Sequence, residues 1–194
     1  MLGPLVLFAI AMCGTPGPNV VLATAMAATF GLRRTLPQIA GVTAGFGAQI
    51  VLAGLGLAGL FASDPRLQTA LKYLGAAYLL YLAWRIATAD GGGKGATGGR
   101  PLGLRDGVVI TWLNPKGCLT TIGALSAFTT PQGNRVLEVG IIAVVLAVAC
   151  GLSLLLWAGF GAAIARWLGR PARRRAVNLA MAALLVLSLV PVLL

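Results

Sequence analysis

The sequence predicts an all-α integral membrane protein with six transmembrane helices arranged as two inverted three-helix repeats. Its composition is the first indication: 58% of the 194 residues are hydrophobic and only 10% are charged, against about 25% charged in soluble proteins. The mean hydropathy is +0.92. Apolar runs of about 20 residues recur along the chain, which is the length that crosses a bilayer as a helix. The period-two alternation of a β-barrel is not found, so we expect helical spans.

The chain is expected to form a single membrane domain over residues 1–194, with the first repeat at about 1–89. No Lys or Arg precedes Arg33, so the first span lacks the basic start of a signal peptide and is expected to be retained. The apolar runs place the three spans of this repeat at about 4–30, 36–61 and 67–89.

A Gly-rich segment at about 90–106 is the one compositional break, and it reads as a flexible cytoplasmic linker. The second repeat is expected at about 107–194. Its spans are placed at 107–128, 136–165 and 177–194. The length of the middle one implies tilt or a bend near Gly159 and Gly161.

The formal charge of +11 arises from 15 Lys and Arg against 4 Asp and Glu. In a soluble protein this excess would indicate nucleic acid, but here the basic residues lie mostly between spans. Odd loops are therefore expected on the cytoplasmic side and both termini outside. Even loops hold or adjoin only Arg66, Lys72 and Arg135. The basic residues of the odd loops are Arg33, Arg34, Arg85, Lys94, Arg100, Arg105, Arg166, Arg170, Arg173, Arg174 and Arg175.

The first span contains a motif that cannot continue a regular helix, Thr15-Pro16-Gly17-Pro18-Asn19. Each proline removes a backbone donor, and its ring clashes with the carbonyl four residues earlier. Non-helical backbone at membrane depth is tolerated only inside protein or beside water, so we expect this segment within the bundle. The half-helix after the break would offer free amides to an anion such as a substrate carboxylate. The alternative is a simple proline kink.

The fourth span carries a second break, Asn114-Pro115-Lys116-Gly117. A charge at mid-bilayer costs about 2.5–3.5 kcal/mol, so we expect Lys116 to face the interior, with snorkelling to the interface as the alternative. Three spans in each half would insert the second half upside down. Breaks at equivalent places in the two halves are typical of inverted-repeat transporters.

The second span carries Gly41 and Gly45 at GxxxG spacing, which predicts close helix packing. Gln49 follows one turn later. Its amide needs either a partner inside the bundle or a place in a binding site, and both possibilities stay open.

Three cysteines, Cys13, Cys118 and Cys150, lie in apolar runs, and the chain has no His. This excludes a zinc site of the usual Cys and His spacing. Cys13 and Cys118 each lie close to a break, so a thiol-disulfide pair is one hypothesis; small buried hydrophobic side chains are the other.

Three motifs in order, Thr15–Asn19, the stretch LGAAYLLYL at 74–82 and Asn114-Pro115-Lys116, make the sequence similar to the lysine exporter (LysE/RhtB) family. The resemblance covers nearly the whole chain. It implies a six-span secondary active exporter of amino acids or related small metabolites in the bacterial cytoplasmic membrane, driven by proton exchange. The family's motif positions here are Thr15, Pro16, Gly17, Pro18, Asn19, Asn114, Pro115 and Lys116.

The sequence departs from the family's pattern at one position that bears on proton coupling. Many members carry an acidic residue after the second glycine of the GxxxG, where this chain has Phe46. The only acids are Asp64, Asp90, Asp106 and Glu138. Of these, we expect Asp106 to come nearest to a cavity.

The sequence therefore predicts an exporter with alternating access rather than an enzyme. We expect no cofactor, no metal and no nucleic-acid partner; a small-molecule cargo and the lipid bilayer are the partners, and a homo-oligomer is left open. The main alternative is a transmembrane thiol-disulfide electron carrier that uses Cys13 and Cys118. A membrane assembly protein without cargo is a third reading. No GxxxxGK[ST] motif for nucleotide binding is present.

Overall fold

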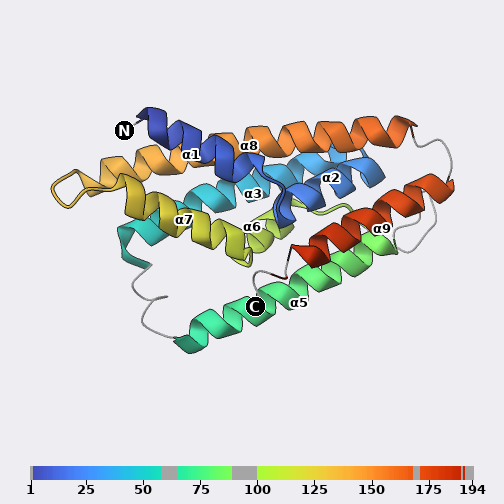
Figure 1. Cartoon of the computed structure of the whole chain (residues 1–194), viewed down its shortest axis with the longest axis horizontal. Coiled ribbons are helices and arrows are strands. Elements are labelled where there is room, and N and C mark those ends of the chain that lie inside the picture. The colour runs from blue at the N-terminus through green and yellow to red at the C-terminus, as the bar shows by residue number, and fades with distance from the viewer. Residues whose placement is uncertain (1, 58–64, 89–99, 168–170, 189, 191–194) are drawn as a thin grey trace.

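The computed structural model describes residues 2–57, 65–88, 100–167, 171–188 and 190, and every regular element in these ranges is helical (Figure 1). The elements, in chain order, are α1 (Leu2–Gly14), α2 (Pro18–Phe30), α3 (Leu32–Leu52), the π-helical turn η1 (Ala53–Leu57), α5 (Pro65–Ala87), α6 (Leu104–Trp112), α7 (Pro115–Phe128), α8 (Arg135–Trp167) and α9 (Pro171–Leu187).

Both predicted breaks are present. α1 and α2 meet at an angle of 55° across Thr15–Gly17, and α6 is separated from α7 by Leu113 and Asn114. Pro18 and Pro115 each stand in the first turn of the helix that follows. That place suits proline because the amide it lacks has no partner there.

Tilt or a bend was expected for the fifth span, and the helix has no break near Gly159 and Gly161, since α8 is one continuous helix of 33 residues. A glycine keeps its backbone donor, so it does not break a helix as proline does. Gly161 serves a close approach instead: a Cβ placed there would lie 2.3 Å from the backbone oxygen of Thr24 in α2.

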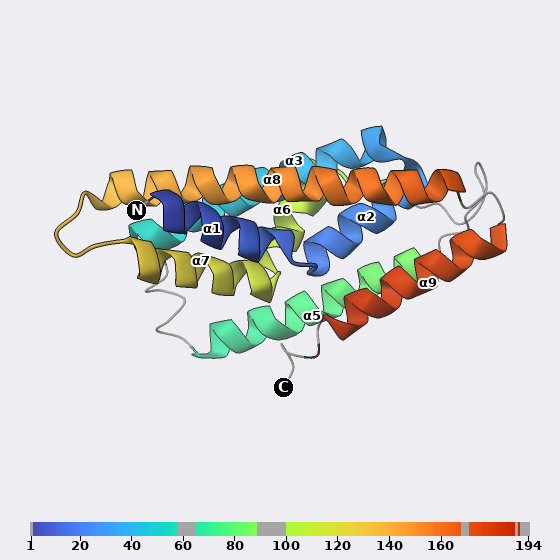
Figure 2. The same cartoon turned by 45° about the horizontal axis from the view of Figure 1, so that its top comes forward.

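The chain runs back and forth along the long axis of the molecule, and α8 extends along most of it (Figures 1 and 2). α1 and α7 lie at the end that holds the N-terminus, and α2 lies toward the other. α5 and α9 pack side by side with opposite directions. The end of α2, the start of α3, the end of α8 and the start of α9 lie at one end of the molecule.

In the part of the chain that the structure describes, the core consists of three apolar clusters. One joins α2, α5 and α9 around Leu22, Leu79 and Leu185. A second joins α1, α3, α7 and α8, and includes Leu5 and Leu146. The third joins α2 and α3 to α8. The two half-helices α1 and α2 thus pack in different clusters, and the break between them lies where these clusters meet.

The GxxxG prediction is confirmed by the contact between α3 and α6. A Cβ on Gly41 would lie 2.0 Å from the Leu104 oxygen, and one on Gly45 would lie 3.1 Å from the Val108 Cα. Gly107 faces them, because its Cβ would lie 2.3 Å from the Gln38 oxygen. The two backbones touch directly, which holds the first part of the broken fourth segment against α3.

Among the described residues, two helical stretches are long and apolar enough to cross a membrane, Leu32–Gly56 and Arg135–Ala165, and the bent pair α1 and α2 makes a third if it is counted as one span. Many large apolar side chains on the outer faces are exposed, among them Leu7 (69%), Leu119 (69%) and Leu156 (76%). Such extensive exposed apolar surface fits a lipid environment. Helix length and composition support a helical membrane protein; six spans in two inverted repeats stay a prediction.

Candidate functional site

The break between α1 and α2 leaves carbonyl groups without helical partners, and two side chains of α8 satisfy them. Ser153 of α8 donates from Oγ to the Cys13 oxygen at 2.7 Å. Trp157, one turn further along α8, donates from Nε1 to the Gly14 oxygen at 3.4 Å. These two contacts, one partly buried and one exposed, attach the C-terminal end of α1 to α8.

The second break is organised by its own asparagine. Asn114 is the N-cap of α7, and its Oδ1 accepts from the Lys116 backbone amide at 3.1 Å. Asn114 is also buried. Asparagine is among the preferred N-cap residues because its short side chain reaches the first free amides. The side-chain oxygen of Asn114 therefore satisfies a free backbone amide at the start of α7.

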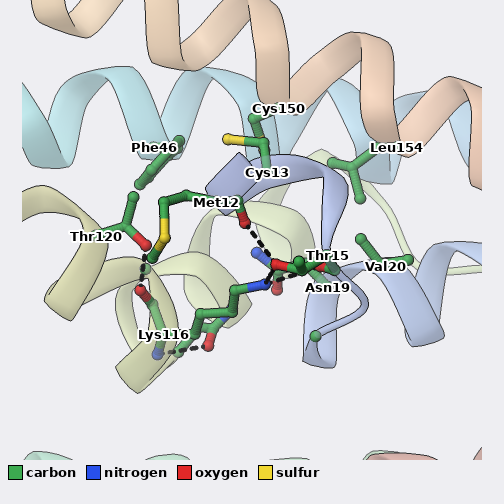
Figure 3. A pocket seen from close by; sticks show the side chains of 13 residues that line it. Met12, Cys13, Thr15, Asn19, Val20, Phe46, Lys116, Thr120, Cys150 and Leu154 are labelled. Carbon is green, nitrogen blue, oxygen red and sulfur yellow. Dashed lines mark hydrogen bonds between the residues drawn. The ribbon is translucent and has the colours of Figure 1, made fainter. Parts of the chain in front are cut away.

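Lys116 connects the two breaks. Its Nζ donates to the Thr15 backbone oxygen at 2.8 Å and to the Thr15 Oγ1 at 2.7 Å, and the side chain points at Thr15 in Figure 3. Thr15 in turn donates from Oγ1 to the Met12 oxygen at 3.2 Å. A Cβ on Gly17 would lie 2.9 Å from the Lys116 Cδ. The aliphatic stem of Lys116 therefore packs directly on the backbone of Gly17. Any larger residue at position 17 would fill this space.

A cavity of about 50 Å³ lies at this junction and opens to the outside of the chain. Five of the predicted residues line it, namely Thr15, Gly17, Asn19, Asn114 and Lys116. Residues that the sequence did not single out for a site also line it: Met12, Cys13, Val20, Phe46, Gly117, Thr120, Cys150 and Leu154. The predicted residues Pro16, Pro18, Pro115 and Gln49 are not part of the lining.

Gln49 lies behind the cavity. Its Nε2 donates to the Cys118 sulfur at 3.2 Å, and its Oε1 is buried without a partner. A Cβ on Gly117, which does line the cavity, would lie 3.5 Å from that Oε1. Gln49 thus has a hydrogen-bond partner inside the bundle, and Gly117 lies between it and the cavity.

Asp106 does not reach the cavity, so that expectation is wrong. Its Oδ2 accepts from the Gly103 amide at 2.7 Å, at the start of α6. A carboxylate in the first turn of a helix is stabilised by the free amides there. Glu138 is used in a similar way, since it accepts from the amide and the hydroxyl of Thr130. Asp64 and Asp90 lie outside the described residues.

Two features of the junction suit a small zwitterion. The N-cap of α2 is Gly17, which has no side chain to accept from the amides of the first turn, and the Lys116 ammonium lies next to it. Free amides at a helix N-terminus together with a cation favour an anion. The Asn19 Oδ1 is buried and has no partner, so it is an acceptor available for an N–H donor.

The Cys13–Cys118 pair, one of two hypotheses from the sequence, is not favoured by the structure. Cys118 accepts from Gln49 and does not line the cavity. Cys13 instead lies close to Cys150 of α8, and both line the cavity. Which cysteines meet depends on how α1 rests on α8, and the position of each residue in its own span carries no information on that. All three are free thiols.

Among the described residues no group of three or more His, Cys, Asp or Glu could hold a metal ion. Ser153 and Trp157 are the residues that sequence reasoning missed in building the site. A lone serine inside the apolar run 136–165 was an available signal, since a buried hydroxyl needs an acceptor.

Comparison with known proteins agrees with this architecture. The chain is 34% identical over 173 residues to the "Cysteine/O-acetylserine efflux protein" of Salmonella choleraesuis (strain SC-B67), covering 89% of this chain and 87% of that protein. It is 35% identical over 147 residues to the protein of that name from Klebsiella pneumoniae, covering 74% and 73%, and 32% identical over 173 residues to that of Escherichia coli (strain K12), covering 89% and 87%. No solved structure matches it. The family model described as LysE type translocator matches residues 10–192. The chain therefore belongs to the LysE type translocator family.

Proposed function

We propose that this chain is a secondary active exporter that carries small amino acids across the bacterial cytoplasmic membrane by alternating access and proton exchange. One observation carries the proposal: the Lys116 ammonium of the second break is bonded to Thr15 of the first break. Two broken helices that meet at a single cation form the kind of junction at which transporters bind their cargo.

The cargo's carboxylate would replace Thr15 as the partner of Lys116. It would sit between that ammonium and the uncapped amides at the start of α2. Charge-assisted hydrogen bonds of this type are about twice as strong as neutral ones. Thr15 can release the lysine at small cost, because its hydroxyl keeps the Met12 oxygen as a partner.

The cargo's ammonium would donate to the Asn19 Oδ1, the buried acceptor without a partner. No Asp or Glu lines the cavity, so nothing there would pair with a second positive charge. This favours a cargo that is neutral overall. The relatives' names, cysteine and O-acetylserine efflux protein, point to two such compounds.

The size of the cavity supports a conformational cycle. About 50 Å³ is room for a few water molecules, given about 10–15 Å³ for the first, and it is too little for an amino acid. Cargo entry therefore requires the two breaks to separate. The contact between Lys116 and Thr15 would belong to a state in which the pathway is closed.

Membrane insertion follows from the family and the apolar helices, which support an integral inner-membrane protein of bacteria. We propose six spans in two inverted repeats, 1–89 and 107–194, with both termini outside. The alternating direction of successive helices supports this topology (Figure 1). A thiol-disulfide carrier is not favoured, because Cys13 and Cys118 are not brought together.

Counterflow in proteoliposomes tests the proposal. The purified chain should exchange labelled cysteine and O-acetylserine across the bilayer and leave labelled lysine behind. A proton gradient should drive net accumulation, and a protonophore should abolish it. Absence of counterflow with every neutral amino acid tested, in vesicles shown to contain folded protein, would refute amino-acid transport.

A further inference from the structure

Cys13 is fixed on α8 at both its sulfur and its backbone. Its thiol donates to the Leu146 oxygen at 3.8 Å, and its own carbonyl accepts from Ser153 at 2.7 Å. Positions 146, 150 and 153 follow one another at helical spacing and share one face of α8. Cys150 thus lies on α8 between the two points where Cys13 is held.

Both thiols line the cavity, and so does Met12 (Figure 3). Three sulfur-bearing side chains therefore border one space of about 50 Å³. Proteins select soft metal ions with thiolate and thioether ligands, and Cu(I) is the common example. A volume of this size admits a single ion.

The other lining groups decide which ion fits. Zinc in proteins takes four ligands, usually Cys, His or carboxylate, and the chain has no His while no Asp or Glu lines the cavity. A hard cation would meet no anionic oxygen there. A soft monovalent ion, in contrast, is satisfied by two or three sulfur ligands.

We propose that Cys13, Cys150 and Met12 form a binding site for a soft monovalent cation of the Cu(I) or Ag(I) type, with the two cysteines as thiolate ligands and the thioether as a third. On binding, each thiol releases its proton to solvent, so one cation and two thiols give a complex of charge minus one and two protons. Lys116, whose charge acts on both cysteines, compensates the negative charge. The ion would lie in the cavity that we assign to the cargo, and it would join α1 to α8 directly at the junction.

Binding is measured with Cu(I) itself. The full-length chain in detergent micelles, kept under reductant without oxygen, is titrated against a chromogenic Cu(I) chelator. We expect one Cu(I) per chain. Cys13→Ser and Cys150→Ser should each weaken binding at least about 100-fold, and Met12→Leu should weaken it by about tenfold or less. Cys118→Ser is the matched control, because this cysteine contacts Gln49 outside the cavity, and it should bind as the parent does.

Two measurements on the unmodified chain guard against variants that misfold. X-ray absorption of the loaded protein should show two or three sulfur neighbours around copper and no nitrogen. Bound Cu(I) should slow alkylation of Cys13 and Cys150 and leave the rate at Cys118 unchanged. Nitrogen or oxygen ligation, equal protection of Cys118, or unchanged affinity in the Cys13→Ser, Cys150→Ser double variant would each overturn the proposal.

Discussion

At the scale of single residues, the side chain of Lys116 is constrained both at its ammonium group and along its aliphatic stem. Its ammonium is held by both oxygens of Thr15, and its stem lies against Gly17 with no room to spare. The interpretation that Lys116 faces the interior of the bundle therefore depends on its contact with Thr15. A snorkelling lysine would make no such contact with residue 15.

Lys116→Met should abolish export while the protein still inserts. The change removes the cost of a charge in the membrane, about 2.5–3.5 kcal/mol, so abundance should equal or exceed that of the parent. It also removes a hydrogen-bonding cation, which contributes about 1.5–3 kcal/mol, and we expect export to fall at least about tenfold. Efflux and membrane abundance are measured side by side.

Lys116→Arg separates position from charge. The guanidinium is planar and bulkier than the ammonium, and Gly17 already lies close to the lysine stem. We expect only partial export from this variant. Normal export by the Met variant, or free replacement by Arg, would instead favour snorkelling and remove Lys116 from the site.

Ser153→Ala should destabilise the junction. It leaves the partly buried Cys13 oxygen without its donor, and an unsatisfied acceptor costs up to about 1–3 kcal/mol when it is fully buried. The midpoint temperature of thermal unfolding, measured in micelles, should fall by a few degrees. Ser126 on α7 is exposed, so Ser126→Ala is the matched control and should change stability by less than about 0.5 kcal/mol. Equal behaviour of the two variants would mean that Ser153 does not hold α1.

The site residues next to the proline breaks could be predicted from the sequence, whereas those on α8 could not. Thr15, Asn19, Asn114 and Lys116 were found because polar or charged groups next to prolines are costly in an apolar run. Cys150 and the capping donors of α8 were not, because their role depends on which face of α8 meets α1. That face is determined by packing between segments more than a hundred residues apart.

At the scale of elements, the helix breaks and the glycine contacts were predictable and the helix ends were not. The second predicted span runs to residue 61, whereas α3 ends at Leu52 and continues as η1. Gly56 has a φ of 127°, a value that L side chains rarely adopt. Arg135 donates from Nε to the Gly54 oxygen at 2.7 Å, a long-range cap that no local pattern announces.

Gly41→Ala should loosen the packing of α6 on α3. The new methyl would lie 2.0 Å from the Leu104 backbone oxygen, so the helices must move apart, and overpacking of this kind costs about 1–3 kcal/mol. Gly140 in α8 has no atom within 4 Å of its Cβ position, so Gly140→Ala should be neutral or stabilise by up to about 1 kcal/mol. Comparing the two unfolding midpoints tests the contact, which equal midpoints would contradict.

At the scale of the whole molecule, an apolar exterior encloses a small polar centre. Many exposed large side chains on α1, α7 and α8 are apolar, and some of the buried polar groups, among them Asn114 and Thr120, lie at the breaks. A soluble protein has the reverse arrangement. Polar groups at the centre of an apolar bundle are costly and usually functional, so this distribution supports a transport pathway through the junction.

The membrane orientation follows from the basic residues and from the direction of the helices. Arg33 and Arg34 lie at the start of α3 and Arg175 near the start of α9, and these helix starts are at the same end of the molecule (Figure 1). Positive residues stay on the cytoplasmic side, so that end should be cytoplasmic and the C-terminus outside.

A green fluorescent reporter, which is dark when exported unfolded, should be fluorescent when fused after residue 99 and dark after Leu194. An alkaline phosphatase fusion at the same two positions is the control and should give the opposite pattern. Fluorescence after Leu194 would overturn the topology, and the inverted repeat with it, because an even number of crossings from an outside N-terminus must end outside.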